Sequence, residues 1–103
     1  MISVPLEHSL ILSGALFAIG VFGLILRNNL IFILLALELM FNACGLAFIA
    51  VGNHYGHDHG QVMFLAILTV AAAEVALGLA LAIKYEHKFG SLSLSRSEPL
   101  REN

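Results

Sequence analysis

The chain has 103 residues, of which 59% are hydrophobic and only 12% charged, and its mean hydropathy is +0.92. A soluble domain of this length needs far more charged side chains on its surface, so the composition excludes a soluble protein and predicts an integral membrane protein. The formal net charge is -2 and the five basic residues are scattered. Nucleic acid is therefore excluded as a partner, and the lipid bilayer is the expected surroundings.

Three apolar stretches, at about residues 9–26, 30–51 and 62–83, follow one another along the chain. Each is close to the roughly 20 residues that a helix needs to cross about 30 Å of hydrocarbon. The segment before the first stretch, "MISVPLEHS", is not basic, so we expect a retained helix and not a cleaved signal peptide. The predicted fold is an all-α integral membrane protein with three transmembrane helices.

The basic residues predict how the chain is oriented. All of them fall between the first two stretches or after the third, at Arg27, Lys84, Lys88, Arg96 and Arg101. Three crossings place these positions on one side of the membrane, and the excess of Lys and Arg predicts that this side is the cytoplasm. The N-terminus is then expected outside, residues 1–83 form a three-helix membrane domain, and residues 84–103 form a polar cytoplasmic tail.

The segment "GNHYGHDHGQ", residues 52–61, predicts an aqueous turn and carries four side chains of metal-ligand type: His54, His57, Asp58 and His59. All four lie in one loop with no second cluster of ligands, so we expect a solvated loop and no metal site. The sequence also contains no glycine-rich phosphate loop and no set of nucleophile, base and orienting residue. No catalytic site is expected to be complete in this chain alone.

Two carboxylates interrupt the apolar stretches: Glu38 in "LLALELMFNA" and Glu74 in "TVAAAEVALGLA". A charged carboxylate at mid-helix costs roughly 2.5 to 3.5 kcal/mol on the insertion scale, so a function is expected to retain it. Glu38 lies eight positions inside residue 30 and Glu74 nine positions from residue 83, which places both at about 12 to 14 Å from the same membrane side. Two antiparallel helices thus bring the carboxylates to one level near the midplane.

Two interpretations of this pair are open. Each glutamate can stay neutral and hydrogen-bond a neighbouring helix, or the pair can exchange protons along a shared lateral path. The matched depth favours proton transfer. Small or polar residues share a helix face with each glutamate: Asn42 and Gly45 with the first, and Ala71, Gly78 and Ala82 with the second. Since three helices alone offer little surface to cover both faces, we expect larger membrane partners to bury them.

The segments "LELMFNA", "GQVMF" and "AAAEVALGLA" resemble subunit K (NuoK type) of bacterial respiratory complex I, the proton-pumping NADH:quinone oxidoreductase. The resemblance runs from about residue 5 to residue 83. It implies that Glu38 and Glu74 match the two intramembrane glutamates of that family, which belong to a chain of protonatable groups in the membrane arm. In one respect the chain departs from the family: Asn28 follows Arg27 where bacterial members often carry a second basic residue.

The resemblance also implies a setting. It places the chain in the bacterial inner (plasma) membrane as a multi-pass protein, beside subunits of the A, J and N types and in one assembly with the H, L and M types. NADH, FMN, iron-sulfur clusters and quinone are expected in partner subunits and none in this chain. The main alternative is a C-type subunit of a multisubunit cation/proton antiporter. A rotary-ATPase ring subunit, normally a two-helix hairpin with one carboxylate, and a purely structural helix bundle are less favoured.

Overall fold

The computed structural model describes residues 4–94 and contains three long helices. They are α1 (Leu6–Leu26), α2 (Leu30–His54) and α3 (His59–Phe89). Each contains one of the predicted spans, and each is long and apolar enough to cross a membrane. The prediction of an all-helical chain with three apolar helices is confirmed.

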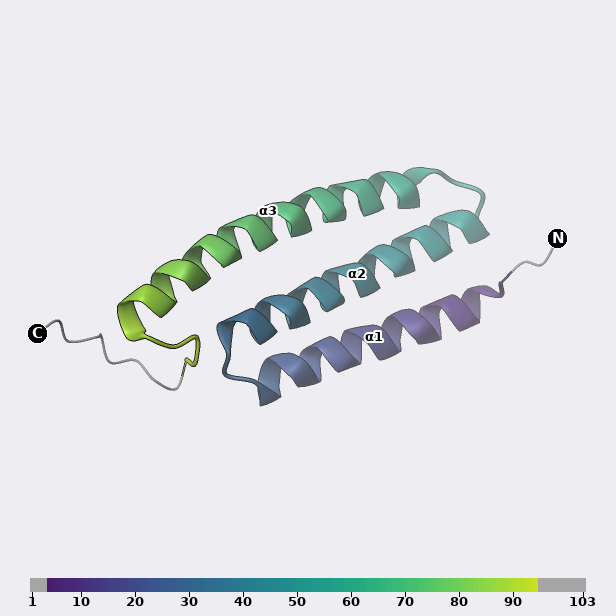
Figure 1. Cartoon of the computed structure of the whole chain (residues 1–103). Helices are drawn as coiled ribbons and strands as arrows, with labels where there is room; N and C mark the ends of the chain where they lie inside the picture. The colour runs from purple at the N-terminus through teal and green to yellow at the C-terminus, as the bar shows by residue number, and fades with distance from the viewer. Residues whose placement is uncertain (1–3, 95–103) are drawn as a thin grey trace, which may run out of the picture.

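The three helices run antiparallel in a single layer with α2 in the middle (Figure 1). Both α1 and α3 pack against α2, and within residues 4–94 they do not pack against each other. The helix α2 therefore has two packed faces, whereas α1 and α3 each have one. All remaining faces carry exposed large hydrophobic side chains, as a chain surrounded by lipid or by other membrane helices requires.

Small residues form the interface between α1 and α2. Ser13, Ala36 and Ala43 are buried there, and the Ser13 hydroxyl donates a hydrogen bond to the carbonyl oxygen of Ala43. Gly20 of α1 has no room for a larger side chain, because a Cβ at this position would lie 2.5 Å from Cγ of Met40. Small side chains let the two backbones approach closely, which is how helices associate where lipid removes the hydrophobic driving force.

The connection between α2 and α3 is shorter than the sequence predicts. His54 is the last residue of α2 and His59 begins α3, so only residues 55–58 form the loop, where Gly56 adopts φ +70°. The expectation that all four ligand-type side chains lie in one loop was therefore wrong. Polar residues continue the helices at both ends because helical hydrogen bonds satisfy the backbone near the hydrocarbon without help from water.

At its other end α3 continues to Phe89, past the end predicted from the apolar run. The helix stops at Gly90, which adopts the left-handed conformation with φ +73° and donates its N–H to the carbonyl oxygen of Glu86 at 2.6 Å. This is the usual role of glycine just after a helix. Residues 95–103 of the predicted tail, with Arg96 and Arg101, lie outside the described residues.

Residues 91–94 then run back toward the loop between α1 and α2, and we call this segment the C-terminal clip. The N–H of Leu30 donates to the carbonyl oxygen of Leu92 at 2.9 Å, and the N–H of Leu94 donates to that of Asn28 at 2.7 Å. Together these bonds form an antiparallel bridge between Asn29 and Ser93. The clip thus joins the end of α3 to the start of α2.

Candidate functional site

Two contacts between large and small residues fix how α2 lies along α3. The side chain of Leu34 rests on Gly78, and the ring of Phe64 rests on Gly45, where a Cβ would come within 2.7 Å of the ring carbon Cδ2. The first contact lies toward the α1–α2 loop and the second toward the α2–α3 loop. Because each glycine lacks a side chain, a large residue of the facing helix packs directly on its backbone.

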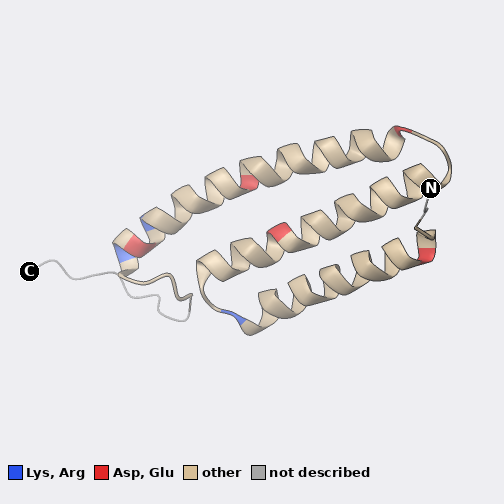
Figure 2. Cartoon of the chain, turned by 45° about the vertical axis from the view of Figure 1, so that its right-hand side comes forward, with Lys and Arg blue, Asp and Glu red and all other residues tan. Residues whose placement is uncertain are grey.

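This register brings the two predicted site residues to the same level. Glu38 follows Leu34 by four residues and Glu74 precedes Gly78 by four, so each lies one turn, about 6 Å, along its helix from the Leu34–Gly78 contact. Figure 2 shows one red, acidic segment within the middle helix and another at a comparable level of the helix above it. The matched depth counted from the sequence thus corresponds to a shared position at the α2–α3 interface.

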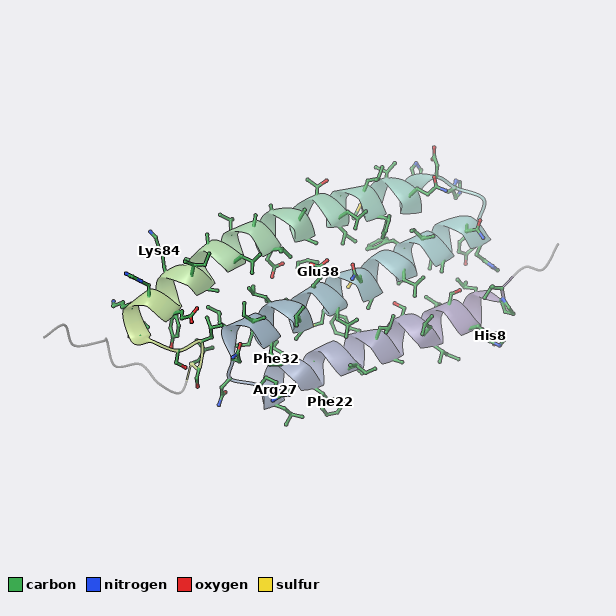
Figure 3. All side chains as sticks on the ribbon, in the orientation of Figure 1. His8, Phe22, Arg27, Phe32, Glu38 and Lys84 are labelled. Carbon is green, nitrogen blue, oxygen red and sulfur yellow. The ribbon has the colours of Figure 1, made fainter. Side chains whose placement is uncertain are left out.

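Glu38 leaves α2 on the side that faces α3 (Figure 3). The residue is half-buried, and its carboxyl oxygen Oε2 is buried with no hydrogen-bond partner among residues 4–94. A buried ionised oxygen without a partner is costly, since neither water nor a donor offsets the lost solvation. Among residues 4–94, no donor therefore offsets a negative charge on this oxygen.

Glu74 lies at the edge of the same interface and also borders an open groove of about 500 Å³. The groove is otherwise apolar, lined by Leu34, Val70, Ala73, Leu77, Gly78 and Leu81. Glu74 is thus the only polar side chain among the described residues that line it. The arrangement places one carboxyl group, Glu38, inside the interface and the other, Glu74, where the interface meets the lateral surface.

The faces predicted around the glutamates are only partly correct. Ala71, Gly78 and Ala82 are buried, but α2 of the same chain covers them, so the expectation that partners are needed for this face was wrong. Because glycine and alanine are small, α2 approaches α3 closely enough to cover this face. Gly45 is likewise buried under Phe64, whereas Asn42 is exposed.

Leu34 and Phe64 are the residues that sequence reasoning missed. Each is one of many large apolar residues in its helix, so nothing in composition distinguishes it. The spacing could have indicated Leu34, because Leu34 and Glu38 are separated by one turn, as are Glu74 and Gly78. This match predicts a contact between Leu34 and Gly78 only when it is known that α2 packs against α3 in antiparallel orientation.

The histidines at the far end do not gather into a ligand set. The rings of His57 and His59 are stacked with their centroids 5.6 Å apart, and the ring of His54 lies edge-on to Tyr55 at 4.9 Å. Across the part of the chain that the structure describes, no three His, Cys, Asp or Glu side chains are placed to hold a metal ion.

Comparison with known proteins decides the family. The model of the NADH-ubiquinone/plastoquinone oxidoreductase chain 4L family matches residues 8–102. The chain is 46% identical to NADH-quinone oxidoreductase subunit K of Chromohalobacter salexigens and to that of Nitrosospira multiformis, over 98% of this chain and 99% of each relative. It is 41% identical to subunit K of Azotobacter vinelandii over the same shares. The chain belongs to the chain 4L family.

Membership of the chain 4L family confirms the resemblance carried by the three quoted segments. It also confirms that the chain is a subunit of NADH-quinone oxidoreductase, the respiratory complex I, and a multi-pass membrane protein. The match covers nearly the whole chain, including the tail that carried no recognisable motif. The family match does not favour the antiporter subunit that was the main alternative.

Proposed function

We propose that this chain carries protons within the membrane arm of complex I, with Glu38 and Glu74 as the proton-transfer groups that help to couple quinone reduction to proton translocation. The observation that supports the proposal best is that Glu38 and Glu74 each lie one turn from the Leu34–Gly78 contact of the α2–α3 interface, and so at one level. Membership of the chain 4L family supports the assignment of this chain to complex I. The position of the two glutamates at the α2–α3 interface supports their proposed role in proton transfer.

The chemistry needs only the two side chains. A protonated carboxyl group donates its O–H, and a carboxylate accepts a proton, so neighbouring carboxyl groups pass a proton by exchanging these roles. Glu74 borders the lateral groove, and Oε2 of Glu38 is enclosed. A proton that reaches Glu74 from the side of the molecule can therefore move to Glu38, and the reverse transfer uses the same two groups.

We further propose the orientation and surroundings of the chain. The described Lys and Arg residues lie at the end of the molecule that holds the α1–α2 loop and the end of α3 (Figure 2). The positive-inside rule then favours a cytoplasmic C-terminus and an outward N-terminus in the bacterial inner membrane. Subunits of the A, J and N types are the proposed neighbours, in an assembly with the H, L and M types. NADH, FMN, iron-sulfur clusters and quinone are proposed to bind to partner subunits.

The test uses Glu38→Gln and Glu74→Gln in the assembled complex. Glutamine keeps the size and hydrogen bonding of glutamate but cannot exchange a proton, so assembly should be normal. Proton pumping should fall by about tenfold or more, since acid–base groups contribute roughly 10²- to 10⁴-fold. Glu86→Gln is the matched control, because Glu86 is exposed near the end of α3 and away from the pair. Normal pumping in both glutamine variants would refute the proposal.

A further inference from the structure

The α2–α3 interface is closed on both sides of the carboxylate pair. Toward the α1–α2 loop, the branched end of Leu34 lies on the backbone of Gly78, one turn from each glutamate. Toward the α2–α3 loop, the ring of Phe64 lies on Gly45, about 10 Å along α2 from Glu38. At both places a large apolar side chain fills the space that a glycine leaves on the facing helix.

Buried alanines extend this closure. Ala71, 2% exposed, lies between Glu74 and Phe64, and Ala82, 3% exposed, lies one turn beyond Gly78. At these two positions α3 packs closely on α2 with small apolar side chains. A water molecule needs both room and two to four polar partners, so a chain of waters has no support along this interface. Apolar constrictions of this kind stop ions and protons in membrane pores.

The lateral direction is different. Glu74 borders the open groove, which runs along the side of α3 past Leu77 and Leu81. The space between the two helices is therefore closed at the two glycine contacts, while Glu74 is open to the groove on the side of α3.

We propose that Leu34 and Phe64 are seals: they prevent protons on the Glu38–Glu74 pair from escaping along the α2–α3 interface to either membrane surface, so that this subunit passes protons only sideways. This inference rests on the proposed function. It adds that two apolar residues that never carry a proton determine where the protons go. A subunit that holds protonatable groups near the midplane without such seals would short-circuit the gradient that the enzyme builds.

The test is the double variant Leu34→Ala and Phe64→Ala in the assembled complex, reconstituted in vesicles without NADH or quinone. Decay of an imposed pH gradient, followed with a pH-sensitive dye, should become several-fold faster than in the wild type. The matched control is Leu35→Ala and Leu65→Ala, which truncates the two adjacent leucines; both are exposed, at 58% and 62%, and lie outside the interface. The control vesicles should stay tight.

Two additions test whether the leak uses the pair. Adding Glu74→Gln to the double variant should slow the leak toward the wild-type rate, because the escaping proton must pass through the carboxyl groups. Adding Gly78→Leu instead returns a leucine side chain to the first contact from the opposite helix, so the leak should fall to that of Phe64→Ala alone. A leak that persists with Glu74→Gln would show protons bypassing the pair and would overturn the proposal.

If the double variant fails to assemble, the single variants Leu34→Ala and Phe64→Ala test whether these residues are seals. Each single variant connects the Glu38–Glu74 pair to one membrane surface, so quinone reduction should continue while fewer protons are pumped per quinone reduced. The proposal that Leu34 and Phe64 are seals would be overturned if the pH gradient decayed no faster in the double variant than in the wild type. It would also be overturned if both single variants pumped the normal number of protons per quinone reduced. These failures differ from failure of the proposed function, which would appear as normal pumping in both Glu38→Gln and Glu74→Gln.

Discussion

Gly60 lets α2 and α3 meet at the end next to their loop. A Cβ at this position would overlap the carbonyl group of Phe48 and lie 3.2 Å from Cα of Gly52, both of which belong to the backbone and cannot move aside. We predict that Gly60→Ala destabilises the α2–α3 pair by about 1 to 3 kcal/mol through overpacking. Gly14→Ala is the control, because a Cβ there meets nothing within 4 Å.

The measurement is the melting temperature of the purified complex together with the amount of this subunit that it retains. The alanine at position 60 should lower both, and the alanine at position 14 should change neither. Equal behaviour of the two variants would show that the close approach at Gly60 does not limit packing. Both substitutions are in helices, so a difference in helix propensity does not explain the expected result.

At this scale the sequence identified Glu38 and Glu74 because a carboxyl group in an apolar run is unusual, and residue counting gave their common depth. It placed Gly45 and Gly78 on faces expected to contact protein, but it did not indicate which large residue lies on each, and it did not identify Gly60 as a contact point. Asn42 lies one turn after Glu38, as the spacing predicts, and its side chain is exposed on the surface of this chain.

The C-terminal clip joins the end of α3 to the loop between α1 and α2. Its bond from the N–H of Leu94 to the carbonyl oxygen of Asn28 is lost in Leu94→Pro, because proline has no N–H to donate. We predict that this variant releases the α1–α2 loop, so that the amide of Leu30 exchanges its hydrogen faster with solvent. Hydrogen exchange of the peptide that covers this loop in the purified complex measures the effect.

Leu92→Pro is the control for the clip, because it keeps the carbonyl oxygen of Leu92 and the N–H of Leu94 that form the bridge. Exchange at Leu30 should be clearly slower in this variant than in Leu94→Pro. If the two prolines act alike, the bridge does not hold the loop.

The helices themselves were predictable, and their ends were not. Apolar runs of sufficient length gave three helices with approximate cores. The runs stop where polar residues begin, but α3 continues through Lys84 and Lys88 to Phe89, because a helix satisfies its backbone in water as well as in lipid. The clip depends on a contact between residues far apart in the sequence, and no local pattern indicates it.

For the molecule as a whole, the distribution of basic residues predicts an outward α2–α3 loop and a cytoplasmic clip. In a Cys44→Ser background, a single cysteine at His57 should react with a membrane-impermeant reagent added from outside intact cells. A cysteine at Ser91 should react only after the membrane is opened. The reverse pattern would place the positive end outside and invert the proposed topology.

The single layer also explains what this chain needs from its surroundings. Because α1 and α3 each pack on one side of α2 only, most large hydrophobic side chains remain exposed, including those beside Glu74 in the groove. The expectation of partners therefore survives on different ground: the small-residue face of α3 is covered within the chain, and the outer apolar faces are not.

We propose that a carboxyl group on α2 carries protons only where it faces α3, and moving that group along the helix tests this most directly. Phe41 lies three residues after Glu38 and four before Gly45, so it stays on the side of α2 that faces α3. Met40 instead packs on Gly20 of α1.

The measurement is the number of protons pumped per quinone reduced by two assembled double variants, Glu38→Gln with Phe41→Glu and Glu38→Gln with Met40→Glu. The account predicts that the carboxyl group at position 41 restores clearly more pumping than the one at position 40, which should remain as low as Glu38→Gln alone. Equal pumping by the two, or more pumping with the group facing α1, would contradict it.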